Sequence, residues 1–313
     1  MPYYLWKAVL GRTPKIEITK EEHDAIIVAW RSIVAVVAIE EEWDSLIRNY
    51  IELEMELLKS AMHSIVLNHE SYHEMQQERL EFSRRLSNLL QTCRSYIDHA
   101  PHHLGKLDDG AFKAAFDGLR KTAHAAHFGY RFMDAMRNYA QHRGVPLHGS
   151  TYNAQWTGDL VDDAKGLLQH SVAASVNLDK IREDRNFNAK VRGELEGVDK
   201  LDVATLTREY IEALGSIQTA LRARLKESLT NWKGTVRAAM EQYAAVNKGD
   251  VVGLSVAEFS TDDRLIAAVN IFDELLERQE RLVRRNGSLV NLRRRYVTNE
   301  ILPPKRSRAK NAK

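Results

Sequence analysis

The chain has 313 residues, of which 44% are hydrophobic and 28% charged, and its formal net charge is +2. This length and composition suffice to bury a sizeable core. The near-neutral balance excludes binding to nucleic acid through an overall basic field, so any such contact must come from a local site. Cys93 is the single cysteine, which excludes a disulfide framework and a cysteine-rich zinc site and favours a reducing compartment.

The chain carries no membrane-targeting pattern. Residues 1–7 lack the basic region and the following apolar region of a signal peptide. The longest apolar run covers residues 33–39, far short of the roughly 20 residues that a membrane span needs. We therefore expect a cytoplasmic protein without a membrane partner.

The first half of the chain predicts helices. Residues 1–18 are expected to form an irregular lead-in with a short extended piece, and Thr19 is the expected N-cap of the first helix. Apolar residues at helical spacing then continue to about residue 67, which fits one long helix or two. Pro101 is expected to end the helix that follows. The other helices expected in this half cover residues 71–100, 111–119 and 123–143.

After residue 146 the pattern changes. Two short, partly alternating segments, 146–156 and 170–178, predict the strands of a small ribbon, and residues 251–259 predict a further strand. A ribbon of this size is stable only where it packs on other elements. The remaining helical pattern covers residues 179–197, 205–229, 231–246 and 265–285.

The expected fold is mainly α. Residues 1–146 predict an antiparallel helical bundle, and residues 147–302 predict a second, mostly helical region with a small β-ribbon and no assigned function. Residues 303–313 are basic and expected to be disordered. The composition shift near residue 146 marks the boundary, although one continuous helical assembly fits the pattern equally well.

The histidines suggest no metal centre. His69 and His73 have the i, i+4 spacing that can hold a metal on one helix face, but the sequence indicates no third ligand. A solvated pair is the simpler interpretation. We therefore expect neither a metal nor a cofactor.

The sharpest motif is Arg137-Asn-Tyr-Ala-Gln-His142, at the end of an amphipathic helical run. Gly144 and Pro146 follow at once and are expected to end the helix. The segment from Arg143 to His148 repeats the spacing, but because it contains Gly144 and Pro146 it cannot present both residues on a helix, and we set it aside.

The residue types of the motif suit cleavage of RNA. His142 can act as a general base or acid near neutral pH, and Arg137 offers a planar fork to phosphate oxygens. Asn138 can orient His142 or a phosphate through its amide. Residues five apart on a helix point about 140° from each other, so one motif cannot easily surround a phosphate. A helix C-terminus also favours Arg and His through its dipole, so a purely structural role is the alternative.

An Arg-Asn-x-x-x-His motif at a helix end in an all-α bundle resembles the HEPN superfamily of α-helical ribonucleases. The continuation Arg143-Gly-Val-Pro146, the chain length and the single motif resemble more narrowly the abortive-infection (AbiF-like) group of that superfamily. The motif covers six residues, and the compatible bundle covers roughly the first half of the chain. The second half resembles no family.

The resemblance implies a metal-independent endoribonuclease of the toxin and antiviral-defence type. Arg137, Asn138 and His142 would be catalytic, in a composite site that two motifs form across a homodimer. Its partners would be an RNA substrate and an inhibitory antitoxin, either protein or RNA, because such an enzyme must be restrained. The alternatives are a non-catalytic HEPN-like module that binds RNA or a protein partner, and a helical scaffold in which these are surface residues.

Further residues are candidates for supporting roles. Asp98 and His99 end a predicted bundle helix and are expected to reach the same end of the bundle as the motif. A second set consists of basic residues expected to contact RNA phosphates, with a solvated surface as the alternative. These are Arg143, Arg293, Arg294 and Arg295.

Overall fold

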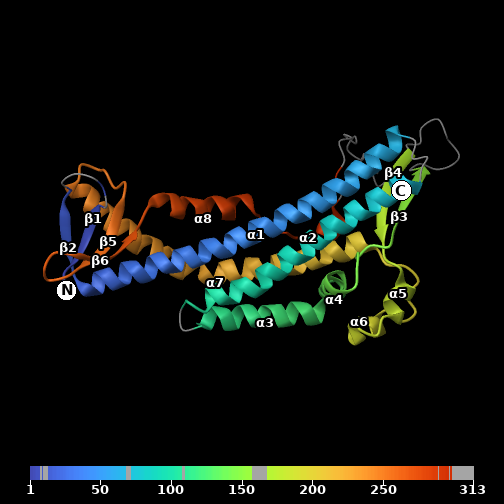
Figure 1. The fold of residues 1–313 in the computed structure, drawn as a ribbon, viewed down its shortest axis with the longest axis horizontal. Helices are drawn as coiled ribbons and strands as arrows, with labels where there is room; N and C mark the ends of the chain where they lie inside the picture. The colour runs from blue at the N-terminus through green and yellow to red at the C-terminus, as the bar shows by residue number, and fades with distance from the viewer. Residues whose placement is uncertain are drawn as a thin grey trace, which may run out of the picture.

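The computed structural model describes residues 1–7, 9, 13–67, 72–107, 110–156, 168–287, 289–295 and 297. Long helices lie side by side in an elongated body, with a sheet at one end and a two-stranded ribbon at the other (Figure 1). The expectation of a mainly helical fold with small antiparallel sheets is confirmed, whereas a bundle of the HEPN type stays a prediction. The three longest helices are α1 (Lys20–Val66), α2 (Tyr72–Leu104) and α7 (Val203–Val246).

Helix α1 begins at the predicted N-cap. The Thr19 hydroxyl accepts a hydrogen bond from the Glu22 N–H at 3.1 Å, and the Glu22 carboxylate accepts one from the Thr19 N–H at 2.8 Å. This reciprocal capping box satisfies donors that a helix start leaves free. The helix then runs for 47 residues without a break, about 70 Å at 1.5 Å per residue. The structure thus selects one long helix over two.

A first hydrophobic core joins both halves of the chain. In this core Trp43 of α1, Leu89 of α2 and Phe132, which all precede residue 146, pack with Leu214, which follows it. Within it the Tyr96 hydroxyl donates to the Gln218 side-chain oxygen at 2.8 Å. The domain boundary near residue 146 stays a prediction, and the residues on its two sides share this core.

A second core lies under the sheet at the other end. The sheet is fully antiparallel with the order β2-β1-β5-β6. Leu5 and Val256 of the sheet pack there against Trp30 and Val236 of the long helices. The strands are β1 (Tyr3–Lys7), β2 (Lys15–Ile18), β5 (Leu254–Phe259) and β6 (Leu265–Asn270).

One expectation about this end is incomplete and another is wrong. The lead-in, expected to hold one short extended piece, contains two paired strands, β1 and β2, and the helix expected over 265–285 starts only at α8 (Asp273–Arg285) because Leu265–Asn270 forms β6. Strand β5 lies between β1 and β6, so both of its edges are hydrogen-bonded. Strand β6 forms a short hairpin with β5, which β1 holds from the other side, and this pairing overrides the local helical pattern. The strand expected over 251–259 is confirmed.

The predicted ribbon is confirmed at the opposite end. Strands β3 (Gly149–Trp156) and β4 (Leu168–Ser175) pair antiparallel, from Gly149 opposite Ser175 to Trp156 opposite Leu168. Strand β4 packs against α1, and the Tyr152 hydroxyl donates to Glu78 of α2. These contacts with helices stabilise a ribbon that would be marginal alone.

The remaining helices differ from the expected ones in their ends and breaks, and the helix expected over 179–197 is two short helices, Leu178–Glu183 and Ala189–Glu194. Helix α2 continues past Pro101 to Leu104, and the helices expected over 205–229 and 231–246 are the single helix α7. No helix in the described ranges is long and apolar enough to cross a membrane. The shorter helices are α3 (Ala111–Ala126), α4 (Phe128–His142), α5 (Leu178–Glu183), α6 (Ala189–Glu194) and the 3-10 helix η2 (Leu292–Arg294).

Candidate active site at the end of helix α4

The motif occupies the last turns of α4, as the sequence predicts. The Arg143 N–H donates to the Tyr139 carbonyl at 2.8 Å and closes the last turn. The chain then leaves the helix at Gly144, whose φ of +152° is readily available only to glycine. Pro146 follows, which has no N–H to continue a helix. Asn138 and His142 are exposed at this end, and Arg137 is half-buried.

One face of the helix end borders a cavity of about 420 Å³. Asn138, Tyr139 and His142 line it from α4, and Asp184 and Phe187 line it from the loop between α5 and α6. In the described part of the chain the His142 imidazole makes no hydrogen bond and no ion pair. Both of its ring nitrogens are therefore open to a ligand in the cavity.

Arg137 reaches this cavity only through Asn138. Its Nη1 donates to the Asn138 side-chain oxygen at 3.0 Å, and it is not among the residues that line the cavity with His142. The angle between Arg137 and His142 on the helix accounts for this separation. Asn138 holds the guanidinium of Arg137, rather than the imidazole of His142. The Nε of Arg137 is buried and finds no hydrogen-bond partner in the described ranges.

A second, basic cavity of about 300 Å³ borders another face of α4. Tyr130 and Asp134 line it and precede Arg137 by seven and three residues, so the three side chains share that face. The Tyr130 hydroxyl is buried and has no hydrogen-bond partner among the residues that the structure describes, and burial raises its pKa, which keeps it a neutral donor. The basic residues that line this cavity from α2 and α3 are Arg94, Arg120, Lys121 and His124.

Sequence reasoning missed this basic cavity. Its cationic side chains come from two helices, α2 and α3, and in the sequence each of them fits the solvent-exposed face of its helix. Burial lowers the pKa of His124, and the neighbouring Arg131 lowers it further against the opposing effect of Asp134. The side chains of Arg94 and Arg120 keep contacts with Asp98 at 2.7 Å and Asp117 at 3.6 Å.

His148, set aside in the sequence, lies against the motif helix. Its Nε2 is 3.1 Å from the Tyr139 hydroxyl, and its Nδ1 accepts a hydrogen bond from the Asn177 N–H at 3.2 Å. Nδ1 therefore carries no proton, and the proton of the neutral ring is on Nε2. Burial, with Lys180 and Arg79 nearby, lowers the pKa of His148 and favours this neutral form. Gly144 and Pro146 end the helix, and the chain then returns along it.

Other predicted site residues are held elsewhere. Asp98 accepts a hydrogen bond from Arg94 at 2.7 Å, and His99 Nδ1 lies 2.7 Å from a Glu42 oxygen. The structure does not bring Asp98 and His99 to the cavity at His142. Neither residue lines that cavity, and a supporting role for them stays a prediction.

The predicted RNA-contacting arginines differ in their surroundings. Arg143 Nε lies 3.8 Å from an Asp184 oxygen at the edge of the cavity. Arg293 donates to the Glu212 carboxylate at 2.9 Å on α7, so its charge is already compensated. Arg294 and Arg295 are exposed. His69 of the pair considered as metal ligands and the tail of residues 303–313 lie outside the described residues.

Metal ligands and relatives add no further constraint. Among the described residues, no group of three or more His, Cys, Asp and Glu side chains has the geometry to hold a metal ion. Comparisons with models of known families, with curated proteins and with solved structures found no match for this chain. The HEPN resemblance rests on the motif of residues 137–142 and on its placement at a helix end.

Proposed function

We propose that the protein is a cytoplasmic, metal-independent endoribonuclease that works as a homodimer, of the HEPN type and AbiF-like. The observation that carries the proposal is the end of α4, where His142 opens into a cavity without a partner among the described residues, and where Asn138 holds Arg137 on another face of the same helix end. An imidazole can move the protons in cleavage of a phosphodiester, and a fixed guanidinium can stabilise the charge on the phosphate. An inhibitory protein or RNA partner would restrain the enzyme in the cell.

The proposed reaction is an internal transfer. The ribose 2′-oxygen loses its proton to one His142 and attacks the adjacent phosphorus, while the bond from phosphorus to the 5′-oxygen breaks. The leaving 5′-oxygen takes a proton from the His142 of the second copy, and the product carries a 2′,3′-cyclic phosphate. Arg137 stabilises the charge on the phosphate oxygens.

The basic cavity beside α4 supports RNA as the substrate. Tyr130 and Arg137 lie seven residues apart on one face of the helix, about 10 Å along its axis. A phosphate held by Lys121 in this cavity would lie next to the one that Arg137 binds. A polyanionic strand would thus meet successive cationic positions, which a single small phosphate ester would not use.

A row of exposed apolar residues on α1 offers a surface for the second copy. Its residues alternate spacings of four and three, the pattern of a coiled-coil seam, and their exposed fractions run from 45% to 62%. We call this row the α1 stripe. It consists of Ile51, Met55, Leu58, Met62 and Ile65.

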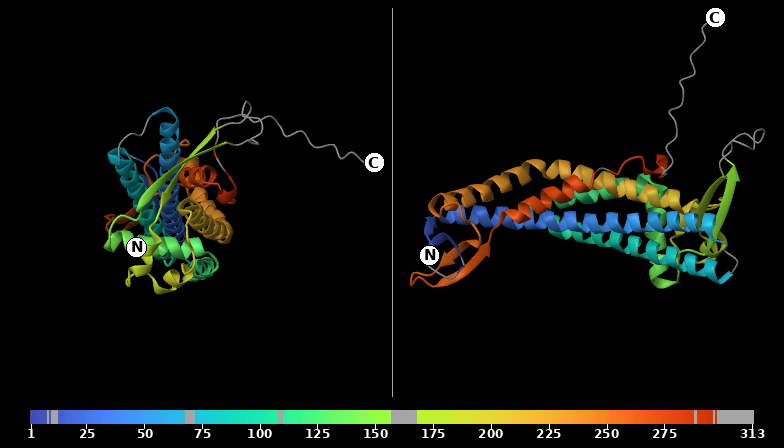
Figure 2. Two further views of the ribbon diagram at one scale, coloured as in Figure 1. Left: turned by 90° about the vertical axis from the view of Figure 1, so that its right-hand side faces the viewer. Right: turned by 90° about the horizontal axis from the view of Figure 1, so that it is seen from above.

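An antiparallel pair of copies fits the α1 stripe. Glu52 and Lys59 flank it one heptad apart, so a two-fold axis brings Glu52 of each copy opposite Lys59 of the other. Glu52 also pairs with Arg85 on α2. The C-terminal part of α1, the ribbon β3–β4 and helix α4 lie toward the same end of the molecule (Figure 2). A dimer through this stripe would therefore join the motif-bearing ends.

The test compares purified wild type with His142→Ala and Arg137→Ala on single-stranded RNA. We expect the wild type to produce fragments with 2′,3′-cyclic phosphate ends, and each variant to cut about 10²–10⁴-fold more slowly because proton transfer or charge stabilisation is lost. The exposed His102 provides the control variant His102→Ala. Circular dichroism checks that all variants fold.

The outcomes separate the candidate functions. A wild type that cuts no RNA when freed of any partner would end the enzyme proposal. If that wild type still bound RNA, and His142→Ala bound it equally, the non-catalytic binding module would take its place. Equal loss of cleavage in His102→Ala and His142→Ala would show that the effect does not belong to the motif.

A further inference from the structure

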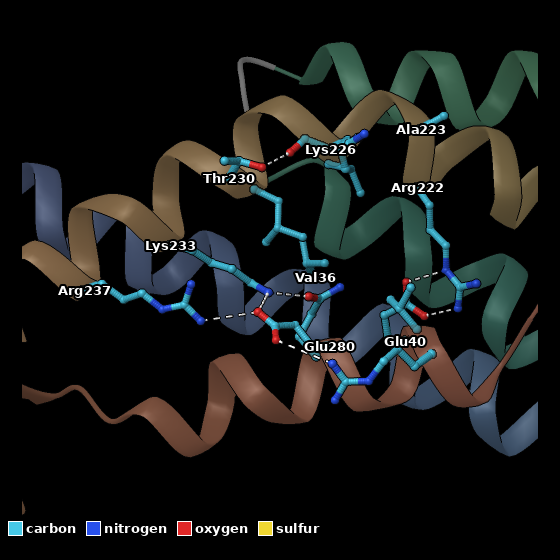
Figure 3. A pocket seen from close by; sticks show the side chains of 14 residues that line it. Val36, Glu40, Arg222, Ala223, Lys226, Thr230, Lys233, Arg237 and Glu280 are labelled. Carbon is cyan, nitrogen blue, oxygen red and sulfur yellow. Dashed lines mark hydrogen bonds and ion pairs between the residues drawn. The ribbon is translucent and has the colours of Figure 1, made fainter.

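A cavity of about 630 Å³ lies between α1, α7 and α8 (Figure 3), and none of its lining residues belongs to α4. Its inner wall is aliphatic and comes from Val36, Leu225, Leu229 and Val283. Val36 and Leu225 belong to the first core, and Leu229 packs against both cores. The cavity therefore opens where the two cores meet, and it leaves apolar surface without a packing partner.

The polar rim of this cavity holds one compensated ion pair. Arg222 donates from Nε and Nη2 to the two oxygens of Glu40 at 2.9 and 2.6 Å (Figure 3). Glu40 is only 2% exposed, and the bidentate contact satisfies its charge. This pair contributes structure to the cavity but little net charge.

The rest of the rim carries an excess of positive charge. The nearest contacts of Lys233, Arg237 and Arg284 with Glu280 are 3.0, 3.3 and 3.8 Å, so three cations share one carboxylate (Figure 3). Arg237 also lies 3.9 Å from Asp273. In the described part of the chain, the ammonium group of Lys226 on the same rim has no ion pair.

The burial of Lys233 strengthens the effect of this positive charge on an anion. Lys233 is 8% exposed, and its ammonium group donates to the Gln279 oxygen at 2.7 Å as well as to Glu280. A cation in an apolar-walled hollow is poorly screened, so its field acts strongly on an anion that enters. The pKa of Glu280 is lowered by its hydrogen bond from Lys233, which keeps this one carboxylate charged.

We propose that this cavity binds an organic anion with an aliphatic chain, a carboxylate or a phosphate monoester. The chain would cover Val36, Leu225, Leu229 and Val283, and the head group would meet the cations around Glu280. The described lining includes no aromatic side chain on which a planar ring would stack. The volume falls in the range of small-molecule sites, which are mostly apolar with a few placed polar groups.

The test uses isothermal titration calorimetry on the full chain with four probes, below their micellar concentrations. Decanoate and decyl phosphate carry both required features, 1-decanol lacks the charge, and inorganic phosphate lacks the chain. We expect one-to-one binding of at least one of the two chain-bearing anions, at least about tenfold tighter than 1-decanol and inorganic phosphate. The comparison of decanoate with decyl phosphate identifies the preferred head group.

Variants connect the binding to this cavity. Val283→Trp fills the apolar wall and should abolish binding, and Lys226→Gln with Arg237→Gln should weaken the anion at least about tenfold without affecting 1-decanol. Arg224→Gln, an exposed cation on the same helix that lines a different cavity, is the matched control. Because Lys226 and Arg237 are exposed, the double variant should keep the native circular dichroism spectrum.

Several results would overturn the inference. These are no binding of either chain-bearing anion to the wild type, 1-decanol binding as tightly as they do, or unchanged binding in the double variant or in Val283→Trp. An equal loss in Arg224→Gln would also overturn it. None of these results depends on cleavage of RNA, so the binding test and the cleavage test are independent of each other.

Discussion

At the scale of single residues, His148 contacts two partners, one through each nitrogen of its ring. The Asn177 N–H needs an unprotonated Nδ1, and Nε2 then faces the Tyr139 hydroxyl of the motif helix. Protonation of the ring would remove the hydrogen bond at Nδ1 and place a charge in a half-buried position. His148 therefore links the end of α4 to the start of α5 in its neutral state.

This arrangement predicts acid sensitivity of the fold. The pKa of His148 is lowered, so the unfolded chain, with a His pKa near 6.5, binds more protons than the native state. The contribution of His148 to stability is therefore present above pH 6.5 and is lost as the pH falls from there toward its lowered pKa. His103 and His124 are shifted in the same direction and add to the effect.

Urea unfolding at pH 7.5 and pH 5.5 measures this effect. We expect the free energy of unfolding of the wild type to fall on acidification. It should fall less in His148→Gln, because the variant has no ring to protonate. The exposed His102 gives the control variant His102→Gln, which should lose as much as the wild type. If His148→Gln and the wild type lose the same amount, the neutral His148 is not a source of the pH dependence.

At the scale of elements, the packing of α4 on α7 depends on Gly129. A Cβ at this position would lie 2.8 Å from the Leu206 carbonyl oxygen and 2.9 Å from Glu209 Cβ. The Glu209 carboxylate accepts from the Gly129 N–H at 3.3 Å and pairs with His127 at the same distance. The start of the motif helix is thus seated directly on the backbone of α7.

We predict that Gly129→Ala lowers the free energy of unfolding by about 1–3 kcal/mol, because the backbone of α7 cannot withdraw from the added methyl group. Gly234 within α7 is the matched control, since nothing lies within 4 Å of a Cβ there. Gly234→Ala should raise the free energy of unfolding by about 0.5–1 kcal/mol through helix propensity. Urea denaturation at pH 7.5 measures both, and equal effects of the two substitutions would contradict the close packing of α4.

At the scale of the whole molecule, exposed apolar side chains gather toward the end that carries the motif. The α1 stripe is joined there by Tyr72 of α2 and by Trp156 and Leu168 of the ribbon, each more than 40% exposed. Clusters of this kind commonly mark interaction surfaces. The homodimer stays a prediction, and this surface makes it specific enough to test.

The double substitution Met55→Glu and Met62→Glu places like charges on the α1 stripe. We expect light scattering after size-exclusion chromatography to show a dimer for the wild type and a monomer for the double variant, because charges in a seam oppose association. Val28→Glu, an exposed valine near the other end of α1, is the control and should remain dimeric. A monomeric wild type would contradict the dimer, and a dimeric double variant would show that the interface lies outside the α1 stripe.

Signals that act over a few residues were enough to predict much of this fold. Thr19 and Glu22 determine where α1 begins, because each hydrogen-bonds the backbone of the other. Gly144 and Pro146 determine that the motif ends its helix, because neither residue favours a further turn. The alternating pattern around residues 149–156 and 168–175 likewise predicted the ribbon.

Only the tertiary structure decided the features that depend on distant partners. Residues 265–270 have a locally helical pattern, and they form the second strand of a hairpin with β5, whose other edge is paired with the distant N-terminal strand β1. His148 meets Tyr139 only because the chain turns back after Gly144. The cations near Arg137 come from α2 and α3, and the cavity at Lys233 forms where three helices meet. The sequence by itself determined where α1 starts and where α4 ends, through contacts between near neighbours, whereas the cavities and the pairing of β1 with β5 arise from packing between segments far apart in the chain.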